Sequence, residues 1–216
     1  MNSTILKHSI QTGAILAIFA IVGTAFLVAT HFVTKDIIAE SEKQAKLGLI
    51  SQIVPQNTFD NDIIKDAAAL PAAPEIGNRE PTTVYRATKE GEPVAAVLEA
   101  SAPDGYSGRI KFIIAIKAGG EISGVRVIDH HETPGLGDYI EIAKSKWITI
   151  FDGDSLSKTP DNDWKVKKDG GKFEHNAGAT VSPRALIKDV HKTLGYFQEN
   201  QDKIFALPAS IPEAAK

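Results

Sequence analysis

Residues 129–138 bring two adjacent histidines, carboxylates and two glycines into one short segment. Imidazole and carboxylate groups bind metals, so one interpretation is a divalent-metal site made by Asp129, His130, His131 and Glu132. A helical metalloprotease site needs two histidines four residues apart, whereas adjacent histidines at a strand end point to opposite sides. Gly135 and Gly137 suit a loop whose backbone approaches a ligand closely or adopts positive φ. The spacing leaves a structural loop, a ligand loop and a metal site open.

A second segment, Gly178-Ala179-Thr180-Val181-Ser182, precedes a predicted helix over residues 183–198. A hydroxyl at a helix start lies near unpaired N–H groups and the positive end of the helix dipole, a place that favours a phosphate. An ordinary capping turn explains the same residues, because Ser182 is a natural N-cap and Pro183 suits the first helical position. The two readings are compatible if Ser182 caps the helix while Thr180 points outward.

A third segment, residues 104–108, is predicted to be a turn between strands, and Tyr106 in it offers an aromatic ring for stacking. The chain has no cysteine, which excludes disulfides, thiolate metal sites, iron–sulfur clusters and thiol nucleophiles. It has neither a Walker loop nor a GxGxxG motif, so a Rossmann-type nucleotide fold has no support. With 24 Lys+Arg against 27 Asp+Glu and a net charge of −3 in 216 residues, no nucleic-acid partner is expected.

One long apolar segment stands out near the N-terminus. Residues 9–34 contain no Asp, Glu, Lys or Arg. The apolar centre, residues 12–33, would be about 33 Å long as a helix, which matches a bilayer core of about 30 Å. A cleaved signal peptide has a shorter apolar run. The sequence therefore predicts an uncleaved signal anchor over residues 1–34, with a buried core helix as the alternative.

The orientation of this anchor is not decided by charge, because basic residues occur on both flanks. The short leader before the apolar run and the whole domain after it favour a cytoplasmic N-terminus. A single-pass membrane protein with its soluble domain outside the cytoplasm is the resulting prediction.

The remaining pattern predicts an α+β fold. Residues 35–54 have helical periodicity that Pro55 ends, and residues 66–82 look irregular, so residues 35–82 are expected to be a helical stalk and linker. Strands are expected over residues 83–89, 93–100, 109–118 and 121–129, with a hairpin turn at Gly119-Gly120 and Ile110, Phe112, Ile114 and Ile116 on one face. A short helix is expected over residues 139–144. The predicted helix at 183–198 has an apolar stripe made by Leu186, Ile187, Val190, Leu194 and Phe197.

These residues resemble a known family. The chain resembles the G subunit (RnfG/RsxG) of the Rnf, or Rsx, ion-translocating electron transport complex of bacterial inner membranes. The resemblance is carried by the anchor, residues 93–99, residues 102–108, the run Glu132-Thr133-Pro134-Gly135-Leu136-Gly137 and Gly178-Ala179-Thr180. It implies an inner-membrane location with the soluble domain on the periplasmic side. The chain is more distantly similar to the C subunit of the sodium-pumping NADH:quinone reductase. The resemblance runs over almost the whole chain and implies one FMN-binding domain over residues 83–200, followed by a C-terminal tail over 201–216.

The resemblance also implies that FMN is bound covalently, through a phosphodiester bond to the hydroxyl of Thr180. A separate Mg-dependent flavin transferase makes this bond in the family. The family motif usually has Asp six residues before the threonine and Ser or Thr three before it, where this chain has Glu174 and Ala177. Other cofactor-binding residues implied are Gly178, Ala179, Val181, Ser182, Glu132, Thr133, Pro134, Gly135, Leu136, Gly137 and Tyr106.

The implied function is electron transfer through this flavin within a membrane complex that links ferredoxin and NAD to ion movement, with other membrane subunits and lipid as partners. The cofactor carries the redox chemistry, so no catalytic acid, base or nucleophile and no metal are expected in this chain. Two alternatives from other classes are a membrane-anchored scaffold without flavin and a metal-dependent hydrolase that uses residues 129–132.

Overall fold

The computed structural model describes residues 2–210, with side chains from Leu6 onward. Residue 1 of the predicted anchor and residues 211–216 of the predicted tail lie outside the described residues. The chain divides into two compact units, one up to residue 45 and one from residue 46 onward. The helices and strands are α1 (Asn2–Ile53), β1 (Ala68–Leu70), β2 (Thr82–Lys89), β3 (Glu92–Gly105), β4 (Gly108–Lys117), β5 (Ile122–Asp129) and α2 (Val181–Ala206).

Helix α1 has the length and composition of a membrane span. Its most apolar 18-residue window has a mean hydropathy of 2.3, and none of that window is buried within the described chain, unlike a core helix. The hydroxyls of Thr30 and Thr34 each donate a 2.9 Å hydrogen bond to the carbonyl one turn earlier. These bonds satisfy polar groups that hydrocarbon cannot hydrate. The helix ends at Ile53, as predicted from Pro55, because proline cannot continue the helical hydrogen bonding.

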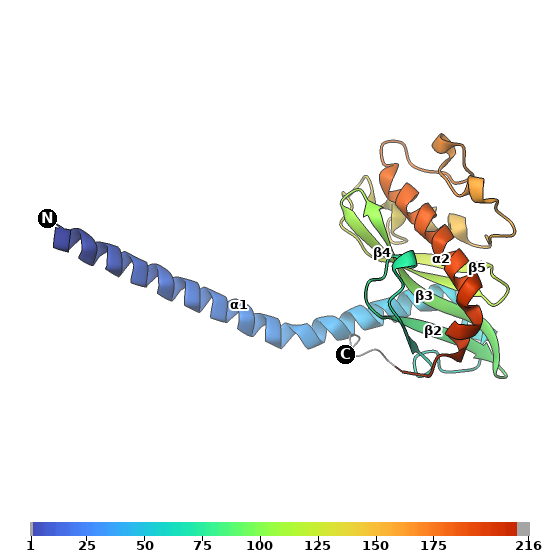
Figure 1. Cartoon of the computed structure of the whole chain (residues 1–216), viewed down its shortest axis with the longest axis horizontal. Coiled ribbons are helices and arrows are strands. Elements are labelled where there is room, and N and C mark those ends of the chain that lie inside the picture. The colour runs from blue at the N-terminus through green and yellow to red at the C-terminus, as the bar shows by residue number, and fades with distance from the viewer. Residues whose placement is uncertain (1, 211–216) are drawn as a thin grey trace. The chain divides into compact units, whose positions relative to one another are not determined.

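The second unit is built on a five-stranded antiparallel meander, β1-β2-β3-β4-β5 (Figure 1). The four predicted strands are confirmed, and so is the hairpin turn, where Gly120 has φ +82°. Strand β3 is longer than predicted, because its pairing with β4 continues to Gly105 and Gly108. Residues 66–82 are less irregular than predicted, since β1 pairs with the free edge of β2.

The sheet is covered on both faces. Helix α2, red in Figure 1, packs across one face, where the predicted residues of β4 and the predicted stripe of α2 are all buried together. On the other face, Val97 of β3 and Ile113 of β4 pack together with Ile50 and Ile53 at the end of α1. Burial on both faces explains the consecutive apolar residues in β3 and β4.

The long connection from β5 to α2 is irregular but has its own packing. The helix predicted at 139–144 is wrong, because the structure has one 3₁₀ turn at Asp138–Ile140 and a second 3₁₀ helix at Lys146–Phe151. A row of aromatic rings packs through this connection with centroids 5.2–5.8 Å apart, formed by Tyr139, Trp147, Phe151, Phe173 and Trp164. Aromatic contacts of this kind hold a polar chain segment in a fixed shape.

Helix α2 continues to Ala206, eight residues beyond its predicted end. The buried guanidinium of Arg86 holds this end. It donates to the carbonyls of Phe205, at 2.9 Å, and Leu207. It also donates twice to the carbonyl of Asp66, at 3.0 and 2.8 Å. A cation at the C-terminus of a helix is favourable because the last carbonyls carry partial negative charge.

Candidate functional site

Three segments that the sequence singled out meet at the carboxylate of Glu132. Its Oε1 accepts a hydrogen bond from the backbone N–H of Ser107, in the turn between β3 and β4, at 3.2 Å. Its Oε2 accepts one from the hydroxyl of Ser182, at the start of α2, at 2.6 Å. The Glu132 residue is only 4% exposed. This side chain therefore joins the turn, the loop after β5 and the helix start into one site.

Two glycines enclose this carboxylate. A Cβ placed on Gly137 would lie 2.9 Å from Glu132 Oε2 and 3.0 Å from Ser182 Oγ. A Cβ on Gly105 would lie 2.7 Å from Glu132 Oε1 and 2.2 Å from a backbone oxygen. The sequence predicted close backbone approach in this loop, and Gly137 requires it. The missing Cβ leaves the space in which Glu132 and Ser182 form their hydrogen bond.

The loop after Glu132 is closed by its own hydrogen bonds. The N–H groups of Leu136 and Gly137 donate to the carbonyl of Thr133 at 3.1 and 3.0 Å. The N–H of Gly135, which has φ +76°, donates to the carboxylate of Asp138 at 2.8 Å. Residues 133–136 are consequently held in a rigid, exposed turn.

The start of α2 differs from the prediction. The helix begins at Val181 and Thr180 is its cap residue, so Ser182 is not the N-cap and Pro183 is the third helical residue. Ser182 is 2% exposed, and its hydroxyl is used by Glu132 instead of by the helix. A long-range hydrogen bond has replaced the local capping bond that this residue type usually makes.

Thr180 is half-buried, and its hydroxyl makes no hydrogen bond with any described residue. Within the described chain, the N–H groups of Val181 and Ser182 also lack an acceptor, and Pro183 has no N–H. The first N–H used near this end is that of Arg184, which donates to the Thr180 carbonyl at 3.2 Å. Two donors and a hydroxyl at one helix start can accept an esterified phosphate.

Sequence reasoning missed the residues that hold the chain before Thr180. The hydroxyl of Tyr139 donates to the carbonyl of Ala179 at 3.0 Å and accepts from the N–H of Asn176 at 3.2 Å. The indole of Trp147 donates to the carbonyl of Glu174 at 2.7 Å. Burial raises the pKa of Tyr139, opposed by the hydrogen bond from Asn176. The sequence signal that could have identified them is the presence of amphipathic aromatic residues in the otherwise polar connection between β5 and α2.

Apolar side chains are exposed around this helix start. Tyr106 is 71% exposed, Leu136 57% and Val181 40%. Among the described residues from 46 onward, Ile64 is the one other large apolar residue that is exposed to a similar extent. One of the three comes from each segment joined at Glu132. Because the three segments are joined at Glu132, these exposed apolar side chains offer a surface for an apolar or aromatic ligand.

The four residues of the alternative metal site are used separately. Asp129 pairs with Lys111 at 3.3 Å, and the Glu132 carboxylate is taken up by Ser107 and Ser182. His130 accepts the N–H of Glu132 at its Nδ1, and His131 is exposed. Within residues 2–210, no group of three or more His, Asp and Glu side chains is arranged to hold a metal ion.

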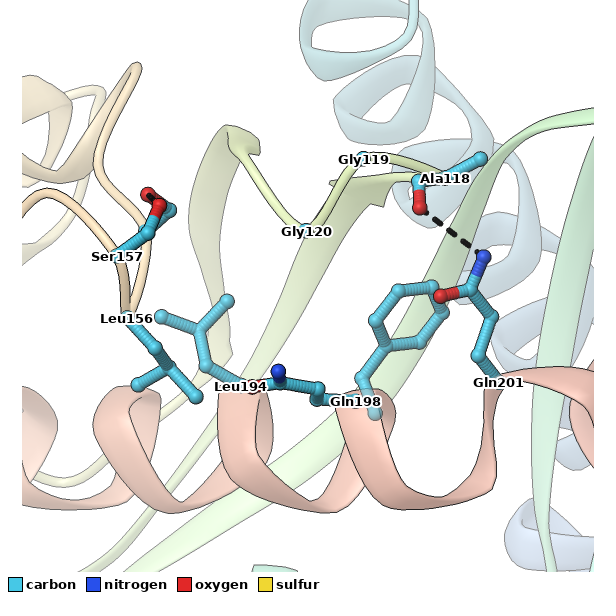
Figure 2. Close-up of a pocket in the computed structure, with 10 residues that line it drawn as sticks. Ala118, Gly119, Gly120, Leu156, Ser157, Leu194, Gln198 and Gln201 are labelled. Carbon is cyan, nitrogen blue, oxygen red and sulfur yellow. Dashed lines mark hydrogen bonds between the residues drawn. The ribbon is translucent and has the colours of Figure 1, made fainter.

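A pocket of about 220 Å³ lies elsewhere, between α2 and the turn that joins β4 to β5 (Figure 2). Figure 2 shows Leu194, Gln198 and Gln201 of α2 on one side, and Gln201 donates to the Ala118 carbonyl at 3.0 Å. Leu194 is 14 residues after Thr180, which is about 21 Å along a helix. This pocket is therefore separate from the site at the helix start.

Comparison with known proteins identifies two regions of the chain. Residues 1–53 match the family model described as the RnfG N-terminal region, and residues 105–195 match the FMN-binding domain model. Ser107, Glu132, Ser182 and Thr180 all fall within the second match.

Curated relatives cover nearly the whole chain. A protein of Pseudoalteromonas atlantica is 41% identical over 196 residues, which is 91% of each chain. One of Shewanella baltica is 42% identical over 92% of this chain and 94% of its own. One of Pseudomonas aeruginosa is 40% identical over 95% and 96%. Each is named as the G subunit of an ion-translocating oxidoreductase complex. Because these relatives are 40–42% identical over 91–95% of the chain, and residues 105–195 match the FMN-binding domain model, the chain belongs to the family of G subunits of ion-translocating oxidoreductase complexes.

Proposed function

We propose that this chain carries electrons within an ion-translocating oxidoreductase complex, through an FMN joined to Thr180 by a phosphodiester bond. The observation that carries this proposal is the unbonded Thr180 hydroxyl at a helix start that Glu132 joins to two other segments. Each of the three segments carries one exposed apolar side chain, namely Tyr106, Leu136 or Val181. The hydroxyl provides the point of attachment, and the three apolar side chains suit a flat aromatic ring system.

The residues fit both parts of FMN. A phosphodiester keeps one negative charge, which the unpaired N–H groups of Val181 and Ser182 and the dipole of α2 can offset. On the exposed side, a Cβ on Gly135 or Gly178 would meet no atom within 4 Å, so these positions leave room for a ligand. When bound, FMN supplies one- and two-electron redox chemistry, while the chain holds and orients it.

The attachment reaction is a transfer of the FMN half of FAD to Thr180. The Thr180 hydroxyl oxygen attacks the phosphorus of the FMN half, the bond to the other phosphorus breaks, AMP leaves with the electron pair, and the hydroxyl proton is released. An Mg-dependent flavin transferase would catalyse this step, since the described part of the chain places no base beside Thr180. A covalent bond also prevents loss of the flavin to an open aqueous compartment.

Placement in the membrane completes the proposal. Helix α1 anchors the chain in the lipid of the inner membrane and contacts other subunits of the complex, and the FMN-binding domain lies on the periplasmic side. The organisation expected from the sequence is kept, with residues 1–34 as anchor, 35–82 as stalk and linker, 83–200 as the FMN-binding domain and 201–216 as tail.

The proposal is tested by coexpression of the full chain with a flavin transferase. After denaturation, the parent band is expected to fluoresce under ultraviolet light and to gain the mass of one FMN less water. Thr180→Val is expected to be dark. Thr149→Val makes the same change at a threonine whose hydroxyl bonds only the Lys146 carbonyl, and it is expected to match the parent.

Two outcomes contradict the proposal. A parent that is colourless before denaturation as well as dark after it, with a transferase that modifies another acceptor, rejects the flavin and supports the scaffold alternative. A yellow parent that releases its flavin on denaturation rejects the covalent bond.

A further inference from the structure

Two hydroxyls lie at the start of α2, and the structure treats them differently. Ser182 is 2% exposed and donates its proton to Glu132 at 2.6 Å. Thr180 is half-buried, and its hydroxyl has no partner among the described residues. A helix turns by about 100° per residue, so residues two apart project to nearly opposite sides. Burial of Ser182 therefore turns Thr180 outward.

We propose that Glu132 is a positioning residue that selects Thr180 as the flavin acceptor, by holding the Ser182 hydroxyl and thereby fixing the rotation of the start of α2. This inference rests on the proposed attachment of FMN to Thr180. Glu132 acts through Ser182 and does not itself touch the acceptor oxygen. It makes Thr180 the one hydroxyl at this helix start that a transferase can reach.

The surroundings of the carboxylate explain why the position is fixed. Glu132 Oε1 is held by the Ser107 N–H at 3.2 Å, so the carboxylate is anchored on the side away from the helix. Gly105 and Gly137 approach so closely that neither leaves space for a Cβ beside the carboxylate oxygens. The Ser182 hydroxyl thus has a rigid acceptor, and rotation of the helix start would break a buried hydrogen bond.

The segment before Thr180 is held independently. Tyr139 bonds the backbone at Asn176 and Ala179. With Ala179 fixed on one side and Ser182 on the other, Thr180 is restrained from both directions. Glu132 supplies the restraint on Ser182. This restraint can be removed without changing the hold of Tyr139 on Ala179.

The test is an in vitro attachment assay with the full chain in detergent, the transferase, Mg²⁺ and FAD. Glu132→Gln and Ser182→Ala are each expected to lower kcat for attachment by about tenfold or more, with little change in KM, because misplacement of the acceptor slows transfer more than docking. Glu132→Gln leaves one acceptor oxygen for the two donors Ser107 and Ser182, and Ser182→Ala removes the hydroxyl. The double variant is expected to be no slower than the slower single variant, since both changes act on the same contact.

Glu121→Gln is the matched control. It neutralises a partly exposed glutamate that pairs with Lys117 and Lys158 at the β4–β5 turn, and its attachment rate is expected to equal that of the parent. Circular dichroism and thermal unfolding establish that each variant is folded at the assay temperature. Should Glu132→Gln not fold, Ser182→Ala tests the same contact with the Ser107–Glu132 bond intact.

Selection itself has a separate readout. Fragment-ion mapping of Thr180→Val is expected to find no FMN on Ser182, because that hydroxyl stays with Glu132. FMN on Ser182 in this variant overturns the inference. So do folded Glu132→Gln and Ser182→Ala chains that react at the parental rate, or losses that multiply in the double variant. A parent that accepts no FMN instead rejects the proposed function.

Discussion

The hydroxyl of Tyr139 donates a 3.0 Å hydrogen bond to the carbonyl of Ala179, the residue before Thr180. The same hydroxyl accepts the N–H of Asn176. Tyr139 packs edge-on against Trp147, with centroids 5.4 Å apart, and is 6% exposed. A buried phenol with two partners on one loop fixes the path of the chain into the candidate site.

Tyr139→Phe is expected to lower the free energy of unfolding by about 1–2 kcal/mol, because it leaves the Ala179 carbonyl and the Asn176 N–H without their partner. Urea unfolding measures this change, and limited proteolysis at residues 174–179 reports the loop directly. Tyr85→Phe is the control, since Tyr85 is 8% exposed and its hydroxyl bonds no described residue. Equal losses in the two variants would show that the Tyr139 hydrogen bonds are unimportant.

Gly137→Ala is expected to separate Glu132 from Ser182, since its Cβ would lie about 3 Å from both side-chain oxygens. Overpacking of this kind costs about 1–3 kcal/mol. Thermal unfolding measures the loss of stability, and the Ser182 hydroxyl proton in NMR reports the hydrogen bond. Gly119→Ala has open space around its Cβ and is the matched control. An unchanged hydroxyl signal in Gly137→Ala would contradict the crowding.

Asp189 makes stability depend on pH. It is 1% exposed, one carboxylate oxygen bonds Lys192 at 3.0 Å, and the other is buried without a partner in the described chain. Burial raises the pKa of Asp189 above its ordinary value of 3.8, against the opposing effects of Lys192 and Lys188. The folded chain then binds more protons than the unfolded chain between these two pKa values, so stability falls as pH rises through that window.

Asp189→Asn resembles the protonated form at every pH. Its stability is expected to equal that of the parent near pH 4 and to exceed it at pH 7, because the parent must ionise a buried group. Urea unfolding at both pH values measures the difference. A variant less stable than the parent at pH 7 would mean that the bond to Lys192 outweighs the cost of burial.

Lys65→Cys tests the orientation in the membrane. The chain has no cysteine of its own, and the side chain of Lys65 is 84% exposed, so one introduced thiol reports one place. A membrane-impermeant maleimide added to cells with a permeabilised outer membrane is expected to label this variant in full. Labelling only after the inner membrane is broken would place the domain in the cytoplasm.

Local patterns in the sequence determined much of the fold. The apolar run of α1, the alternation in β4 and the stripe of α2 each follow from the period of one element, so they can be read without knowing its neighbours. The same holds for Pro55 as the end of a helix and Gly120 as a turn residue. The resemblance to the family likewise rested on short contiguous motifs.

Only the tertiary structure decided how the site is built. Ser182 has the type and place of an N-cap, yet it bonds Glu132, which is 50 positions away in the chain. The start of α2, the burial of Glu132 and the hold of Tyr139 on Ala179 depend on such long-range contacts. A capping preference of about 1 kcal/mol is a local quantity, and a buried hydrogen bond to a carboxylate exceeds it once the chain has folded.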